Sequence, residues 1–193
     1  PCPSPRHVCR QTTGQERLPS GFHMPSQVLS AMKKSRYIPG EVFHDGEHGV
    51  YDGQYGWAVN KKSKHMARVV YERVHENKDF KGVRRGEGLD FAKWVFSEEP
   101  GLAEDIFQSG LELMIDAEME PKAAIGLHWH QRTEEIYYLL EGSIRMTTVS
   151  ADGDEHSETL KAGDAHAVLR GQGHYGRVGA DGVRFMAVSF RRE

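Results

Sequence analysis

From residue 110 onward, short segments rich in β-branched and aromatic residues alternate with turn-forming dipeptides such as Glu141-Gly142 and Asp181-Gly182. The predicted strands cover residues 110–115, 123–130, 135–141, 143–149, 157–160, 166–170 and 183–190. Many short strands at this spacing are typical of an antiparallel sandwich or barrel. A jelly roll, in which two sheets pack face to face, is one such fold that protects its sheet edges. The pattern therefore predicts an all-β fold, with a barrel over residues 108–193.

Residues 24–107 have a more mixed pattern and are predicted to form an N-terminal extension. Residues 88–97 predict a strand, whereas residues 67–74 combine strand and helix signals. Residues 25–34 and 99–107 are each expected to form a short helix, the second with a loop as its alternative. We therefore expect additional strands and one or two short helices, packed on the barrel or on a partner subunit.

Residues 1–23 are polar and contain no apolar core segment of a signal peptide, so they are interpreted as a tail, either vector-derived or native. The tail holds the only two cysteines, Cys2 and Cys9, which do not make a disulfide framework. The default compartment is then the cytoplasm. At 193 residues, the chain is expected to form one domain overall.

Charge and hydropathy argue against two classes of partner. The formal net charge is -3, and Lys and Arg are interspersed with acids rather than gathered in a stripe. Nucleic-acid-binding domains usually show such a basic patch, so we expect no nucleic-acid partner. No apolar run approaches the length of about 20 residues that a membrane helix needs, so we expect no membrane partner.

The chemistry of the chain is concentrated around His128-Trp129-His130. Side chains alternate along a strand, so two histidines one residue apart present both imidazoles on the same face. Glu135 follows five residues after His130, and His174 comes much later. Three imidazole nitrogens and one carboxylate oxygen form a strong site for a divalent first-row metal.

These residues resemble the two motifs of the cupin superfamily. In the first motif, His128-Trp129-His130 is followed by four residues, Glu135, six residues and Gly142. In the second, Gly163 is followed by five residues, the tripeptide 169–171, two residues and His174. The resemblance covers about residues 108 to 190. Two motifs in the right order are a more specific signal than either motif alone.

The chain departs from the motifs at three positions. Lys122 stands where the first glycine is expected, Leu169 replaces a proline, and Val178 replaces an asparagine. None of these is a ligand position, so the departures concern turn geometry.

The resemblance implies a double-stranded β-helix, the jelly-roll barrel of cupins, with His128, His130, Glu135 and His174 as metal ligands. Glu134 is the competing carboxylate, but it faces away from Glu135 on a strand, and the spacing to Gly142 favours Glu135. Fe(II) is the favoured ion, and Mn(II), Ni(II), Zn(II) and Cu(II) remain alternatives because imidazole and carboxylate suit all of them.

The function predicted from this site is that of a metal-dependent enzyme acting on a small organic molecule, with Fe(II)-dependent oxygenation (dioxygenase chemistry, hence an oxidoreductase) as the leading reaction class. A non-redox isomerase, cyclase or lyase is the second hypothesis, and a small-molecule-binding or sensing cupin without catalysis is the third. By the resemblance, a homodimer is expected.

Three further residues are candidates for catalytic roles. Tyr137 lies on the same strand face as Glu135, where it is either an acid, base or hydrogen-bond donor or a packed aromatic. His166 is either a support for the metal ligands or an outer-surface residue. Arg145 is expected to bind an anionic substrate if its side chain faces the interior of the barrel, and otherwise to be a charged side chain exposed to solvent on the outer face of its strand.

Overall fold

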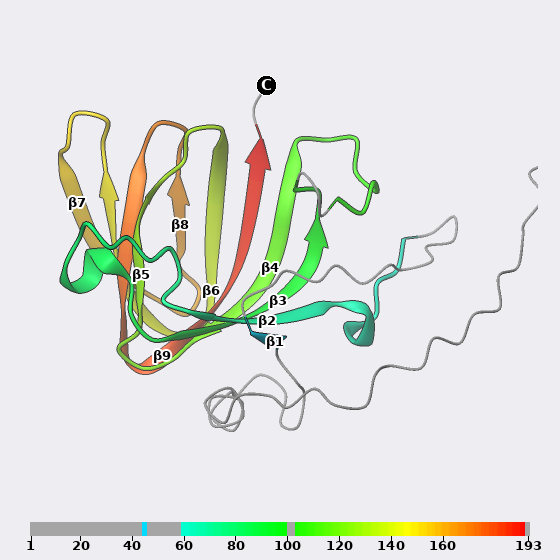
Figure 1. Cartoon of the computed structure of the whole chain (residues 1–193), viewed down its shortest axis with the longest axis horizontal. Helices are drawn as coiled ribbons and strands as arrows, with labels where there is room; N and C mark the ends of the chain where they lie inside the picture. Colours follow the sequence, from blue (N-terminus) through cyan, green and yellow to red (C-terminus); the bar gives the residue numbers. More distant parts are fainter. Residues whose placement is uncertain (1–43, 46–58, 100–102, 192–193) are drawn as a thin grey trace, which may run out of the picture.

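The computed structural model describes residues 44–45, 59–99 and 103–191 (Figure 1). The predicted tail over residues 1–23 and the predicted helix over residues 25–34 lie outside them. The described residues form nine strands and two 3-10 helices: β1 (His44–Asp45), η1 (Ser63–His65), β2 (Ala67–Glu72), η2 (Gly82–Arg85), β3 (Leu89–Ser97), β4 (Leu111–Met119), β5 (Ala124–Trp129), β6 (Thr133–Val149), β7 (Glu155–Lys161), β8 (Ala165–Val168) and β9 (Gly173–Arg191). The predicted all-β fold is confirmed.

The strands form one hydrogen-bonded sheet that folds back on itself into a barrel, because β6 and β9 each run through two layers (Figure 1). The first layer holds β2, β3, β4, the C-terminal half of β9, the N-terminal half of β6, and β8. The second layer holds β5, the N-terminal half of β9, the C-terminal half of β6, and β7.

The turns expected at Glu141-Gly142 and Asp181-Gly182 are bends inside β6 and β9 rather than breaks between strands. Gly142 and Gly182 have φ angles of 74° and 81°, and the β6–β9 register shifts on both sides of Gly142. Glycine adopts positive φ without steric cost, so both strands bend sharply while their ladder continues. Residues 173–178, which the sequence pattern did not predict as a strand, form the first half of β9.

The N-terminal extension contributes β2 and β3, which continue the first layer beyond β4. The ambiguous segment 67–74 is a strand over most of its length, and the strand predicted at 88–97 is confirmed as β3. Within the described part of segment 99–107, residues 103–107 are not helical. No helix in the described ranges is long and apolar enough to cross a membrane.

Alternation along β6 decides which side chains enter the barrel. Glu135, Tyr137 and Leu139 are buried, whereas Ile136 and Tyr138 between them are exposed. Tyr137 and Leu139 join a core that includes Ile144, Met146 and Phe185. The interior of the barrel is therefore apolar, except where the polar side chains described next converge.

Candidate metal centre

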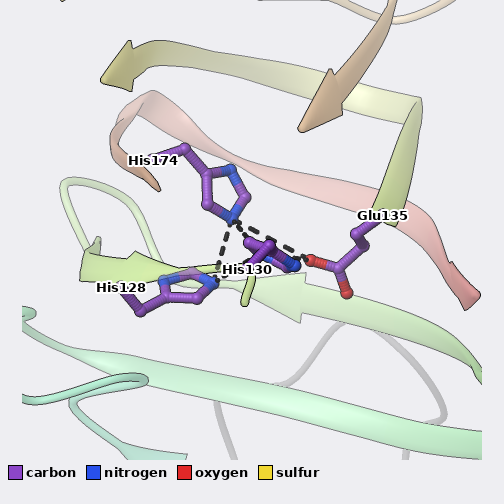
Figure 2. Close-up of side chains that lie close together, drawn as sticks. All are labelled: His128, His130, Glu135 and His174. Atoms are coloured by element: carbon purple, nitrogen blue, oxygen red, sulfur yellow. Dashed lines mark hydrogen bonds and ion pairs between the residues drawn. The ribbon is translucent and has the colours of Figure 1, made fainter. Parts of the chain in front are cut away.

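Four ligand-type side chains from three strands and one loop meet inside the barrel (Figure 2). His128 lies near the end of β5 and His130 just after it, while Glu135 and His174 lie near the starts of β6 and β9. Cross-strand pairing sets His128 directly opposite His174. One ligand atom from each of the four residues lies within 4.8 Å of the others.

The distances between donor atoms suit coordination of a single ion. The three Nε2 atoms are 2.9 Å (His128–His174), 3.1 Å (His130–His174) and 3.3 Å (His128–His130) apart. Metal–nitrogen bonds of about 2.1 Å at right angles place neighbouring donors about 3.0 Å apart. Glu135 Oε2 is 3.6 Å from Nε2 of His130 and 3.9 Å from that of His174, so the carboxylate completes the group.

Each imidazole is oriented through its other ring nitrogen. His128 Nδ1 donates to the Gly126 carbonyl oxygen at 2.9 Å, which leaves a lone pair on Nε2. Nδ1 of His130 lies 3.1 Å from Thr133 Oγ1, and Nδ1 of His174 lies 3.3 Å from His166 Nε2. Partners of this kind orient metal-binding histidines. When the protons of His130 and His174 also lie on Nδ1, the three Nε2 lone pairs converge on one point, where a cation would hold them together, so the donor set fits a metal.

Burial keeps the three histidines uncharged. It lowers the pKa of His128 and of His130 to about 4, and that of His174 well below its usual range, with the neighbouring imidazoles adding to the effect. Burial raises the pKa of Glu135 to about 7, and the Tyr137 hydroxyl acts in the opposite direction. Neutral imidazole is the form that binds metals, so protons compete little for these nitrogens at neutral pH.

The cluster opens into a cavity of about 450 Å³ between the two layers. It is lined by Tyr71, Val74, His75, Asp90, Trp94, Glu99, Glu112, Leu113, Ile115, Met119, Ile125, His128, Trp129, His130, Thr133, Glu135, Tyr137, Phe185 and Ser189. Four of these described residues are acidic and none is Lys or Arg. A molecule in the cavity thus meets carboxylates, aromatic rings and a candidate metal, but no fixed cationic side chain.

The structure separates the three candidate catalytic residues. Tyr137 lines the cavity, and its ring centroid is 5.4 Å from that of His174. His166 contacts His174 from β8, behind the ligand and not among the residues that line the cavity. Arg145 is exposed on β6 between buried Ile144 and Met146, so it points outward and does not reach a molecule in the cavity. Glu134 is not part of the ligand cluster.

Sequence reasoning missed the contribution of the extension. Tyr71, Asp90 and Trp94 line the cavity from β2 and β3, and the His75 ring stacks on His128 with centroids 3.6 Å apart. A signal existed for two of them: Asp90 and Trp94 are four residues apart on a predicted strand, which puts them on one face. Which strand this face would meet depends on long-range pairing.

A family model for cupins matches residues 106–191. Together with the jelly-roll barrel and the three-histidine, one-carboxylate cluster, this match identifies residues 106–191 as a cupin-like barrel.

The proteins similar to this chain include oxalate decarboxylases and a predicted oxalate decarboxylase. The oxalate decarboxylase OxdC of Bacillus subtilis is 40% identical over 57 residues, which span 30% of this chain and 15% of that protein. A predicted oxalate decarboxylase from Thermotoga maritima superposes with a TM-score of 0.53 and 21% identity, covering 69% of this chain and all of that one. A variant of Bacillus subtilis OxdC superposes with a TM-score of 0.51 and 18% identity, covering 80% of this chain and 32% of its own. At these identities the superpositions show a shared fold.

Proposed function

We propose that this cupin is a metal-dependent enzyme that acts on a small organic molecule, with His128, His130, Glu135 and His174 as the metal ligands. One observation carries the proposal: the four donors meet at the wall of a cavity, and three of their side chains line it. Four protein donors leave an octahedral ion with two positions for other molecules. A divalent ion in such a site supplies Lewis-acid or redox chemistry.

The residues of this chain then have distinct roles. The three histidines provide neutral nitrogen donors, and Thr133, His166 and the Gly126 carbonyl hold them in place. Tyr137 offers a hydroxyl next to Glu135, inside the cavity, for hydrogen bonding to a bound molecule. Its pKa is raised well above its usual value by burial, so it acts as a donor rather than as a phenolate.

For the reaction class, we propose oxygenation with Fe(II). The donor set would suit Fe(II), and this ion, held by the four residues at the wall of the cavity, would supply redox chemistry toward dioxygen and a substrate. The second candidate is decarboxylation with Mn(II). It is favoured by the identity to OxdC over 57 residues and by the Mn(II) centres of the Bacillus subtilis enzyme. The absence of Lys and Arg from the described cavity lining speaks against oxalate, because nothing there pairs with a second carboxylate.

Nitric oxide, a surrogate for dioxygen, tests the proposal without knowledge of the substrate. The metal-free protein is loaded anaerobically with Fe(II) and exposed to nitric oxide. We expect the electron paramagnetic resonance signal of a high-spin iron–nitrosyl complex in the natural chain and its loss in His128→Ala. Failure to take up Fe(II), or uptake without a nitrosyl signal, would contradict the oxygenase proposal.

A parallel assay addresses the second candidate. Protein loaded with Mn(II) is incubated with oxalate, and formate is measured. Formate production at enzymatic rates would replace oxygenation by decarboxylation as the reaction class. If neither assay responds although the metal is bound, a binding or sensing cupin becomes the better description. Light scattering tests the expected homodimer separately.

A further inference from the structure

Asp90 is a buried carboxyl group that the proposed metal chemistry does not use. Its exposed fraction is 5%, and its Oδ1 atom has no hydrogen-bond partner in the described structure. In the sheet it lies between Tyr71 of β2 and Met119 of β4, and all three residues line the cavity. A buried polar atom without a partner is uncommon in folded proteins and calls for an explanation.

The other carboxylates of the cavity have partners or charges beside them. Glu112 accepts hydrogen bonds from Ser189 Oγ and from Arg191 Nε, both at 2.9 Å. Glu135 belongs to the ligand cluster. Glu99 is only partly buried and is influenced by the positive charge of Arg191. Asp90 differs from them because its buried Oδ1 has no hydrogen-bond partner among the described residues, and because burial alone accounts for the rise of its pKa to about 7.

The surroundings of Asp90 favour a cation. Tyr71 and Trp94 lie on the same side of β2 and β3, and the Trp94 indole donates to the Tyr71 hydroxyl at 3.2 Å. Aromatic faces attract ammonium groups, and a carboxylate in a space of low polarity binds one more strongly than in water. An anionic group would be repelled by Asp90 and, among the described lining residues, would find no Lys or Arg.

We propose that Asp90 binds the ammonium group of an amine substrate whose other end reaches the metal cluster. The proposal rests on the proposed function, which it narrows from small organic molecules to small amines with a metal-binding group. The partner missing from Oδ1 is then the substrate itself, and the extension, rather than the cupin motifs, selects the substrate.

Three catechols that share a metal-binding head provide the test: 4-ethylcatechol, dopamine and 3,4-dihydroxyphenylacetate, whose tails are neutral, cationic and anionic. Their dissociation constants are measured by calorimetry on the metal-loaded chain. We expect dopamine to bind roughly 10-fold or more tightly than 4-ethylcatechol, and the anionic compound to bind most weakly. In Asp90→Asn, dopamine should fall to the level of 4-ethylcatechol.

Glu72→Gln is the matched control, because Glu72 neighbours Tyr71 on β2 but its side chain is 69% exposed. It should leave the dopamine preference intact. Near-ultraviolet circular dichroism checks that Asp90→Asn is folded. If 4-ethylcatechol binds and dopamine has no advantage that depends on Asp90, the proposal for Asp90 is wrong while the metal site stands. If no catechol binds to the metal-loaded chain, both proposals fall.

Discussion

Gly142 of β6 lies so close to Gly182 of β9 that a Cβ atom on Gly142 would be 2.0 Å from the Gly182 carbonyl oxygen. The two glycines mark the bends at which β6 and β9 pass from one layer of the barrel to the other. This contact therefore sets how the halves of each strand, and the ligands they carry, are placed.

Gly142→Ala should destabilise the protein by roughly 2 kcal/mol or more, because it combines a backbone clash with a side chain at positive φ. Gly153→Ala is the control, since its φ is 90° but a Cβ there would meet nothing within 4 Å. It should cost about 1 kcal/mol. Denaturant unfolding of both variants measures the difference, and equal costs would show that the contact is unimportant.

Lys122, which replaces the glycine usual in the first cupin motif, has a φ of 65°. A lysine in this conformation is strained, so Lys122→Gly should raise the free energy of unfolding by about 0.5–1 kcal/mol. Lys161→Gly, at the end of β7 where φ is not positive, should lower it instead. A loss of stability in Lys122→Gly would mean that contacts of the lysine outweigh the strain.

Glu135, and not its neighbour Glu134, should be required for metal binding. Glu135→Gln removes the anionic donor from the cluster, and we expect at least a roughly 10-fold loss of affinity for Fe(II) or Mn(II). Glu134→Gln should bind both ions as the natural chain does. Competition with a chromogenic chelator gives the two affinities, and equal losses would place the carboxylate ligand elsewhere.

His166 should act through His174, whose Nδ1 lies 3.3 Å from His166 Nε2. His166→Phe keeps an aromatic ring at this position but removes the hydrogen bond, which should lower metal affinity roughly 10- to 100-fold. A positioning role also predicts an altered ligand-field spectrum of the Co(II)-loaded protein, which mere loss of stability would not produce. His156→Phe, on the exposed surface of β7, should change neither property.

Asp90→Asn should stabilise the metal-free protein in a pH-dependent way. The pKa of Asp90 is raised from 3.8 to about 7 in the folded state. Between about pH 4 and 7 only the unfolded state releases this proton, so the free energy of unfolding of the unsubstituted chain falls as the pH rises through this range. The gain from Asp90→Asn should be near zero at pH 4 and reach on the order of 2–4 kcal/mol above pH 7.

The ionisable side chains that Asp90 influences are Tyr71 on β2 and Tyr137 on β6, and burial raises the pKa of both, so they contribute no charge in this range. Unfolding of both proteins in urea from pH 4.5 to 8 measures the gain. A gain that did not grow with pH would show that Asp90 has a compensating partner.

The meeting of the four candidate ligands was predictable partly from local spacing and partly from the resemblance to the cupin motifs. His128 and His130 share a strand face, and the distances along the chain to Glu135, Gly142 and His174 match motifs that specify how strands turn back. The sequence predicts turns where β6 and β9 bend, because a glycine with positive φ occurs both in a turn between two strands and in a bend within one strand. Only the hydrogen-bonded ladder, which continues through the bend, distinguishes the two structures.

The wall of the cavity was not predictable in the same way. Asp90 and Trp94 could be assigned to one strand face, but the partner of that face depends on β3 pairing with β4, a contact between residues far apart in sequence. The orientation of Arg145 does not follow from the sequence pattern for a related reason. The bend at Gly142 shifts the register, so alternation counted from Glu135 does not carry through to the second half of β6.

The four candidate ligands come from both layers of the barrel. Glu135 belongs to the half of β6 in the first layer, whereas His128 and His174 belong to strands of the second. A bound ion would thus act as a cross-link that resists separation of the layers. Release of the ion and separation of the two layers would then be coupled events. Amide hydrogen exchange in β5 of the second layer and β8 of the first would therefore slow when the ion is bound.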